Sequence, residues 1–431
     1  MANVAGLWAA GYCRDMAILT LNAGSSSIKF ALFGGEQNDA RLLHGAVSRV
    51  GTGGAKLAAF NEGGGVLCDE PVKAENAADA GGQVIAWLKS RFLGTGGNGV
   101  AGSEEDGVAM GVPIAIGHRI VHGGTRSLDH QRINAALLAE MDKAAPLDRA
   151  HMPAQIGLIR QCQQQFEGLP QFACFDTVFH AGLPRIATML PLPRKYFDAG
   201  VRKYGFHGLS YEFLMAELLR VGDAGEAQGR VLLAHLGAGA SLAAVAKGVP
   251  VDTTMAFTPT SGLMMATRPG DLDPGVMVYL AREGGLDAAG MDRMMNTECG
   301  LLGVSETSGD IRDLLGRRAT DERAAEAVAL FCRSVVKNIG AMAAAMGGID
   351  TLIFAGGVGE NAAEIRAEIC KDLAFLGVGI DAGRNERGCG VISHIECGEA
   401  TKVVVRIVRT DEEAMIARHV VRMMGTGMSG A

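Results

Sequence analysis

Short apolar runs alternate along the chain with segments in which apolar residues recur every three or four positions. Runs rich in Leu, Ile, Val and Ala, typical of buried strands, occupy residues 114–116, 231–234, 351–355 and 403–408. Helical spacing of apolar positions occurs at residues 211–220, 324–346, 362–373 and 412–424. Because the two patterns alternate along the chain, the sequence predicts an α/β fold.

Two stretches share one plan and suggest an internal repeat. Residues 18–33 read ILTLNAGSSSIKFALF and residues 231–248 read VLLAHLGAGASLAAVAKG. Each is an apolar strand, a polar residue, a turn of glycine and small residues, and a second apolar strand. Backbone N–H groups and serine hydroxyls in such a turn favour an anion such as phosphate. An ordinary hairpin turn explains the pattern about as well, and no Walker A sequence is present.

A third glycine-rich segment, TLIFAGGVGENAAEIRAEICKDL at residues 351–373, favours nucleotide binding. It predicts a buried strand, a glycine turn, an N-cap and an amphipathic helix, formed by Gly356, Gly357, Gly359, Asn361, Ile365, Ile369 and Leu373. A strand, glycines and a helix N-terminus make a common docking site for nucleotide phosphates. With the two hairpins, this segment resembles the two-lobed ATPase fold of actin, heat-shock chaperones and sugar kinases.

Length and composition predict two domains. At 431 residues, with 48% of them hydrophobic, the chain exceeds the roughly 250–300 residues at which a single core stops growing. We expect an extension at residues 1–15, an N-terminal lobe at 16–177 and a C-terminal lobe at 178–411. A last helix at residues 412–425 should pack on the N-terminal lobe, and residues 93–111 should form a surface loop.

Charge and cysteine usage narrow the class of partner. The net charge of −7 argues against nucleic acid, and no run approaches the roughly 20 apolar residues of a membrane span. Nine cysteines are scattered without a Cys-x-x-Cys pair, which predicts reduced thiols in the cytoplasm. The expected partners are therefore small molecules.

Seven ordered blocks of the chain resemble the acetate kinases. They span essentially residues 16–425 and read LNAGSSSIKF, GHRIVHGG, FDTVFH, YGFHGLS, HLGAGAS, TRPGDLDPG, and FAGGVGEN with TDEEAMIAR. The resemblance implies reversible, Mg²⁺-dependent phosphoryl transfer from ATP to acetate, giving acetyl phosphate and ADP. It also implies a mixed sheet flanked by helices in each of two lobes, an active site in the cleft between them, and a homodimer joined through the C-terminal lobe.

The catalytic residues come from this resemblance and agree with the chemistry. Phosphoryl transfer to an ionised carboxylate needs positioning and cations around the transition state rather than a strong base. The resemblance assigns that task to Arg119 and Arg268. It makes His207 a donor to the phosphoryl group, gives His151 an orienting role, and assigns Asp176 to the metal's water or the phosphoryl group.

The resemblance also assigns the ligands. Mg²⁺, for which Mn²⁺ could substitute, would be held by Asn22 and Glu412, which supply hard oxygen atoms. The residues assigned to ATP are Ser25, Ser27, Lys29, His235, Gly237, Gly239, Asp310, Arg312, Gly357 and Asn361. The residues assigned to the substrate pocket are Val121, Ala150, Phe206 and Pro259.

Each catalytic residue also has an ordinary interpretation. A lone arginine is usually a surface ion pair, Asp176 could cap a turn, Glu412 could sit favourably in the first turn of a helix, and His207 could be a core histidine. Three other functions stay open: a kinase for propionate or another short carboxylate, a sugar kinase, and a non-catalytic ATP-binding protein of the same fold.

Three positions depart from the family pattern. Ala238 replaces an asparagine that would contact the phosphates, and Ala266 replaces a glycine. Ala150 takes the place of a leucine that would face the substrate's methyl group. A larger pocket would accept propionate, unless Met152 or Leu147 fills the space.

Overall fold

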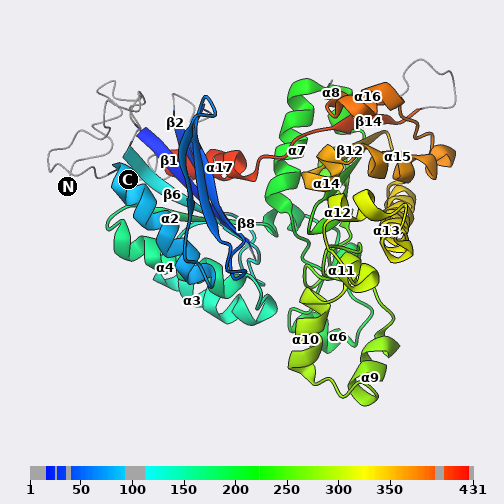
Figure 1. The fold of residues 1–431 in the computed structure, drawn as a ribbon, viewed down its shortest axis with the longest axis horizontal. Helices are drawn as coiled ribbons and strands as arrows, with labels where there is room; N and C mark the ends of the chain where they lie inside the picture. The colour runs from blue at the N-terminus through cyan, green and yellow to red at the C-terminus, as the bar shows by residue number, and fades with distance from the viewer. Residues whose placement is uncertain are drawn as a thin grey trace. The chain divides into compact units, whose positions relative to one another are not determined.

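The computed structural model describes residues 16–24, 27–34, 40–92, 112–222, 224–393 and 402–426. The expected extension at 1–15, the expected loop at 93–111 and Ser25 lie outside these ranges. The chain forms two compact units, which Figure 1 shows. Unit 1 comprises Met1–Val178 with Asp411–Ala431, and unit 2 comprises Phe179–Thr410.

Unit 1 contains an eight-stranded mixed sheet in the order β5-β4-β3-β2-β1-β6-β8-β7. Its strands are β1 (Met16–Ala23), β2 (Ser27–Gly34), β3 (Ala40–Ser48), β4 (Lys56–Asn61), β5 (Val66–Pro71), β6 (Val112–Ile120), β7 (Gln131–Arg132) and β8 (Gln171–Phe175). Its helices are α2 (Ala77–Phe92), α3 (Ala135–Ala144), η2 (Ala145–Leu147), α4 (Met152–Gln165) and α17 (Glu412–Thr426), and η3 (Val178–His180) lies at the boundary between the units.

Alternation along β1 decides what covers each face of this sheet. Leu19 joins the main core of unit 1 with residues of α2 and α4, whereas Thr20 and Asn22 point to the opposite face. Gly117 of β6 lies beside Thr20, and a Cβ at Gly117 would come within 2.4 Å of Ile416 in α17. The missing side chain therefore lets α17 pack directly on the sheet, on the face that carries Asn22.

Unit 2 contains a six-stranded mixed sheet in the order β11-β10-β9-β12-β14-β13. Its strands are β9 (Arg230–Leu236), β10 (Ala240–Ala246), β11 (Val249–Thr253), β12 (Thr351–Ala355), β13 (Gly390–Val391) and β14 (Val404–Ile407). Its helices are α5 (Arg185–Thr188), α6 (Arg194–Asp198), α7 (Gly208–Val221), α8 (Ala224–Gln228), α9 (Pro274–Arg282), α10 (Ala288–Thr297), α11 (Gly300–Ser305), α12 (Ile311–Arg317), α13 (Glu322–Met346), α14 (Gly356–Asn361), α15 (Ala363–Lys371), η4 (Ala374–Leu376) and α16 (Ala382–Arg387).

The sheet of unit 2 repeats the alternation seen in unit 1. Val231 and Leu233 of β9 pack with Tyr211 and Leu214 of α7 in one core. The other face of β9 and β10 is covered by α13. Because side chains alternate along a strand, polar residues at odd-numbered positions of β9 and β10 face α7.

By length and composition, α13 is the one helix in the described ranges that could cross a membrane. Nine of its residues are buried, and it packs against β9, β10 and β11 as well as α11, α12 and α15. These contacts make α13 a core helix of unit 2.

Both predicted hairpins are present, because β1–β2 and β9–β10 are antiparallel pairs. The prediction that Asn361 caps the following helix is wrong. A left-handed Gly356, with φ +76°, turns the chain from β12 directly into α14. Asn361 therefore already lies in a helix, where its side-chain amide donates to Gly357 O at 2.9 Å, and α15 begins after Ala362.

Candidate functional site

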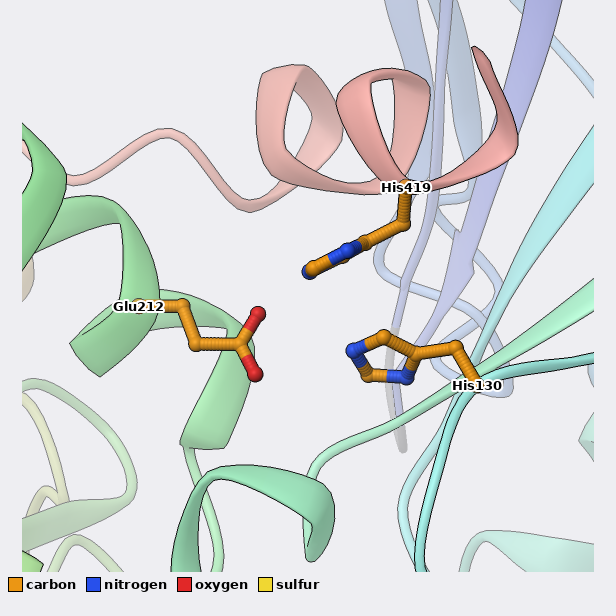
Figure 2. A group of neighbouring side chains, drawn as sticks. All are labelled: His130, Glu212 and His419. Carbon is orange, nitrogen blue, oxygen red and sulfur yellow. The ribbon is translucent and has the colours of Figure 1, made fainter. Parts of the chain in front are cut away.

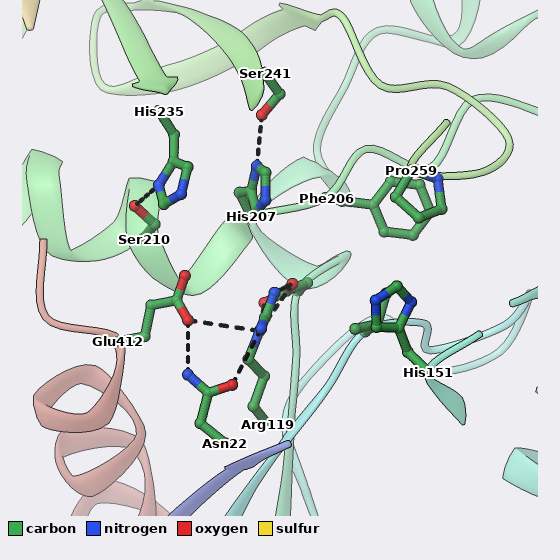
Figure 3. Close-up of polar contacts among 12 residues, drawn as sticks. Asn22, Arg119, His151, Phe206, His207, Ser210, His235, Ser241, Pro259 and Glu412 are labelled. Carbon is green, nitrogen blue, oxygen red and sulfur yellow. Dashed lines mark hydrogen bonds and ion pairs between the residues drawn. The ribbon is translucent and has the colours of Figure 1, made fainter. Parts of the chain in front are cut away.

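A charged cluster gathers at the strand ends of unit 1 around Arg119. Its Nε donates to both carboxylate oxygens of Asp176 at 3.1 Å, and its Nη2 donates to Asp176 Oδ2 at 2.6 Å. Its Nη1 donates to Asn22 Oδ1 at 3.1 Å, and Glu412 lies 3.6 Å from Nε, as Figure 3 shows. Asn22 in turn donates to Glu412 and Glu413 at 2.9 and 3.0 Å.

Local structure explains why these side chains meet. Asn22 ends β1 on the face that α17 covers, and Glu412 and Glu413 open α17, where a helix N-terminus favours carboxylates. Arg119 stands near the end of β6, and Asp176 directly follows β8, which pairs with β6. Four segments distant in sequence therefore contribute to one site.

The cluster keeps Arg119 charged. Burial alone would lower the pKa of Arg119, but the neighbouring carboxylates of Asp176 and Glu412 raise its pKa above the usual value. Asp176 is fully buried, so its carboxylate depends on this paired guanidinium.

The donor atoms of the cluster suit Mg²⁺. Asn22, Asp176, Glu412 and Glu413 offer amide and carboxylate oxygens, which are the hard ligands that Mg²⁺ prefers. One guanidinium faces three carboxylates here, and an excess of negative charge favours a divalent cation. The residues present therefore fit the metal expected from the sequence.

A pair of histidines joins α17 to the end of β8, close to this cluster. His130 and His419 lie with ring centroids 4.0 Å apart, and Figure 2 shows both rings. The backbone N–H of Phe175, at the end of β8, donates to His130 Nδ1 at 3.1 Å. The pair thus ties α17 to the strand end from which Asp176 projects.

In unit 2, His207 and Arg268 converge on the turn of the second hairpin. A Cβ at Gly239 would lie 2.8 Å from Arg268 Nη2 and 3.3 Å from His207 Nε2. Arg268 also donates to the carbonyl of Pro259 at 2.7 Å. Two nitrogen-bearing side chains therefore approach the backbone of this turn closely, which suits a phosphate site.

Two histidines of unit 2, His207 and His235, are stacked and lie within hydrogen-bond distance of hydroxyl groups. The rings of His207 and His235 have centroids 4.2 Å apart and are inclined by 23°. His207 Nδ1 is 2.8 Å from Ser241 Oγ, and His235 Nδ1 is 2.8 Å from Ser210 Oγ, as Figure 3 shows. Each ring therefore has one nitrogen held by a hydroxyl group.

Most of the nucleotide residues predicted in unit 2 line one pocket. The pocket has a volume of about 530 Å³, and its lining includes Gly237, Ala238, Asp310, Arg312, Gly357 and Asn361. Arg312 Nε donates to both oxygens of Asp310, at 3.1 and 3.2 Å. This side-chain hydrogen bond lowers the pKa of the Asp310 carboxyl. Gly239 and His235 belong to the same hairpin.

Two of the residues predicted for the first hairpin, Ser27 and Lys29, lie on β2. Ser27 begins β2, and its carbonyl accepts the N–H of Gly24 at 2.9 Å. Lys29 is exposed and lies opposite Asn22 in the strand register. A lysine beside the metal-binding candidate is consistent with a phosphate contact.

The predicted substrate residues divide between the units. In unit 1, Val121 is buried, Ala150 is exposed, and His151 bonds through Nδ1 to Asp148 at 2.9 Å. In unit 2, Phe206 and Pro259 are buried.

Several polar residues that hold the predicted site residues in place were not predicted from the sequence. Buried Gln155 bridges the ends of two strands, because its side chain accepts from Val121 N–H at 3.0 Å and donates to Ala23 O at 2.9 Å. Glu360 accepts from Gly356 N–H at 2.9 Å and from Thr410 N–H at 3.1 Å. Two of these residues could have been found from the sequence. Glu413 is adjacent to Glu412, and Tyr211 follows His207 by one helical turn.

The chain is similar in sequence and in structure to known proteins of one family. The sequence matches the acetokinase family over residues 17–418. It is 39% identical over 419 residues to the acetate kinase of Rhodopseudomonas palustris (strain ATCC BAA-98 / CGA009), covering 95% of this chain and 99% of that protein. The crystal structure of a propionate kinase from Francisella tularensis subsp. tularensis SCHU S4 matches with a TM-score of 0.81 at 32% identity, covering 94% of this chain and 98% of that one.

The crystal structure of Porphyromonas gingivalis acetate kinase matches with a TM-score of 0.78 at 34% identity, covering 95% of this chain and 100% of that one. These likenesses, with the two mixed sheets, confirm the fold class predicted from the sequence.

Proposed function

The chain belongs to the acetokinase family, and from this premise we propose that it is an acetate kinase. It would transfer the γ-phosphoryl group of ATP to acetate, reversibly, giving acetyl phosphate and ADP. The observation that carries the proposal is the Arg119 cluster, in which a charged guanidinium is held among the oxygens of Asn22, Asp176 and Glu412. Such a site positions anions and a divalent cation, as phosphoryl transfer requires.

The catalytic roles follow from the chemistry of each side chain. Arg119 and Arg268 stabilise the negative charge that spreads over the transferred phosphoryl group. His207 donates a hydrogen bond to the same group, and His151, held by Asp148, orients the substrate. Magnesium, held by Asn22 and Glu412 with Asp176 beside them, would neutralise charge on the phosphates when bound.

The nucleotide occupies the pocket of unit 2 in this proposal. Asp310 and Arg312 contact the adenosine, and the turns at Gly237, Gly239 and Gly357 contact the phosphates through their N–H groups. Asn361, His235, Ser25, Ser27 and Lys29 complete the ATP-binding set.

The proposal includes a homodimer in the cytoplasm. No residue of α9 is buried, and Val276, Val278 and Tyr279 are 40%, 49% and 64% exposed. Exposed apolar side chains grouped on one helix are typical of a protein interface. The seven cysteines in the described ranges are free thiols, which supports a reducing compartment. Light scattering of the purified chain tests the dimer.

Trapping of the acyl phosphate tests the activity. Incubation with ATP, Mg²⁺, acetate and hydroxylamine should yield acetyl hydroxamate from the parent and far less from Arg268→Ala. Circular dichroism should first show that both proteins are folded. If the parent yields no more acetyl hydroxamate than Arg268→Ala, the proposal is wrong, and a non-catalytic ATP-binding protein is favoured.

Propionate is the second candidate substrate. A solved propionate kinase shares this fold closely. Ala150 is exposed, while Met152 is buried in the unit 1 core and Leu147 packs against that core.

The test compares kcat/KM for acetate, propionate and butyrate in the parent and in Ala150→Leu. Because each buried methylene contributes about 0.8 kcal/mol, the parent should use propionate at least as well as acetate, and Ala150→Leu should favour acetate. A parent that prefers acetate more than about tenfold contradicts the larger pocket.

A further inference from the structure

We propose that Tyr211 and Ser241 form a hydroxyl relay that sets the tautomer of His207 and keeps its proton on Nε2. The inference rests on the proposed function, in which His207 donates to the transferred phosphoryl group. It makes Tyr211 and Ser241 positioning residues, which act through His207 and do not themselves contact substrate.

The fold brings the three side chains together. His207 precedes α7 in a left-handed conformation, with φ 59° and ψ 26°, and its carbonyl accepts the N–H of Tyr211 at 3.0 Å. One helical turn therefore separates the imidazole from the phenol, so both lie on one side of α7. Ser241 of β10 faces the same helix and contacts both, with Oγ 2.8 Å from His207 Nδ1 and hydrogen-bonded to the Tyr211 hydroxyl.

The number and strength of the hydroxyl donors decide which group donates in each hydrogen bond of the relay. Ser241 has a single hydroxyl proton, and a phenol is a stronger donor and weaker acceptor than an aliphatic hydroxyl. Tyr211 therefore donates to Ser241 Oγ, and Ser241 donates to His207 Nδ1. Each bond strengthens the next, because donors and acceptors in a chain polarise one another. An imidazole that accepts at Nδ1 carries its proton on Nε2.

That tautomer aims a donor at the second hairpin. Nε2 lies 3.3 Å from the position that a Cβ on Gly239 would take, and Arg268 Nη2 lies 2.8 Å from the same position. With the proton on Nε2, both groups present N–H bonds to an anion at this turn. With the proton on Nδ1, His207 would present a lone pair there and repel it.

The stacked neighbour explains why the tautomer matters. His235 lies 4.2 Å from His207, and two imidazolium rings at that separation would repel each other. Arg268 Nη2 lies close to the same Cβ position of Gly239 as His207 Nε2. When His207 is neutral, its imidazole donates from Nε2 in only one of its two tautomers.

Both residues of the relay are fully buried, which isolates it from water. Buried hydrogen-bond chains of this kind hold one arrangement because the alternatives leave a polar atom unsatisfied. Ser241→Ala removes the donor to Nδ1, whereas Tyr211→Phe leaves Ser241 in place but free to rotate. The two variants weaken the same relay to different degrees.

The test is nitrogen NMR of the full-length protein labelled with [¹⁵N]histidine. The chain has 10 histidines, so His207 is assigned by the signal lost in His207→Asn. We expect the parent to show a protonated Nε2 and an unprotonated Nδ1 at neutral pH. Ser241→Ala should give a mixture of tautomers, with kcat about tenfold lower and KM for ATP within about twofold. Tyr211→Phe should lower kcat about threefold.

A matched control separates the relay from local packing. Thr253→Val removes a buried hydroxyl that donates to the carbonyl of Leu242 at 2.8 Å. Leu242 follows Ser241 in β10, and its carbonyl still accepts the N–H of Thr254 in this variant. Its His207 tautomer and kcat should match the parent. A parent protein whose His207 carries its proton on Nδ1 overturns the proposal. The proposal is also overturned if Tyr211→Phe and Ser241→Ala each fold and each keep the parent's His207 tautomer and kcat. A parent without acetyl hydroxamate refutes the proposed function, while the NMR result still decides the relay.

Discussion

The two units repeat one hairpin and place different chemistry at the same register. In β1–β2 Asn22 lies opposite Lys29, and in β9–β10 His235 lies opposite Ser241. The first hairpin lies beside Arg119 and the carboxylates of α17, whereas the second lies beside one arginine, Arg268, together with imidazoles and hydroxyls. The backbone plan decides where the polar groups stand, and the elements packed beside each hairpin decide what those groups do.

The largest difference between the units should appear when their arginines are removed. Arg119→Ala and Arg268→Ala should each lower kcat by roughly 10³-fold, because each removes a cation from the transition state. Arg119→Ala should also destabilise unit 1 by about 3–5 kcal/mol, since buried Asp176 loses its paired charge. Arg268 donates to a backbone carbonyl, so its removal should cost only about 1 kcal/mol. Hydroxamate kinetics and urea unfolding measure the two effects.

The double variant Arg119→Ala with Asp176→Asn is the control for stability. It should recover most of the lost free energy of unfolding without recovering activity. A kcat within about threefold of the parent for either single variant would remove that arginine from the mechanism. Greater destabilisation by Arg268→Ala than by Arg119→Ala would reverse the comparison.

Acid should destabilise the units to different degrees. Burial lowers the pKa of His118 and His122 in unit 1, and of His180 in unit 2, to about 4. Between pH 4 and 6.5, the usual pKa of histidine, the unfolded chain binds more protons than the folded chain. Stability is therefore intact above pH 6.5 and falls as the pH is lowered toward 4, by up to about 3 kcal/mol for each histidine.

Two probes distinguish the units in this experiment. Trp87 belongs to unit 1, so its fluorescence in a Trp8→Phe background reports on that unit, while far-ultraviolet circular dichroism reports on both. The fluorescence midpoint in urea should fall more steeply between pH 6.5 and 4.5 than the dichroism midpoint. His118→Gln should reduce that slope, and an unchanged slope contradicts the assignment to His118.

The smallest effect concerns the turns themselves. The first hairpin turn carries serines, while the second exposes Ala238 to the nucleotide pocket. Ala238→Asn should add one hydrogen bond to the phosphates, worth about 1 kcal/mol, and lower KM for ATP about fivefold. The backbone of Ala238 already accepts Ala266 N–H at 3.0 Å, which holds the turn in place.

Steady-state kinetics with varied ATP measure this effect, with Ala199→Asn, at the exposed residue that follows α6, as the control outside the pocket. A folded Ala238→Asn with weaker ATP use would show that the turn has adapted to alanine.

Local patterns along the chain were enough to predict the α/β class, both hairpins and the helices α7, α13, α15 and α17, but not α2 or α4. Alternating apolar residues specify a buried strand wherever it pairs, and glycine clusters specify sharp turns. The residue types of the site, such as two arginines and an aspartate after a buried strand, were visible for the same reason. The family resemblance supplied their roles, and these roles stay predictions.

The start of α14 could not be predicted from the pattern. Asn361 has the composition of an N-cap, yet Gly356 adopts a left-handed conformation that begins the helix five residues earlier. A Cβ at Gly356 would lie 2.7 Å from Leu236 O, so contact with a strand distant in sequence requires this glycine. Local propensity carries no information about that contact.

The sequence by itself determined which residues could carry charge, donate protons and form strands, because these are properties of side chains and their spacing. Only the tertiary structure decided that Arg119 pairs with Asp176, 57 residues away, and that Asn22 meets Glu412, 390 residues away. It also placed Ser241 between His207 and Tyr211. These contacts depend on strand register and on which helix covers which face, and both are settled by burying the whole core at once.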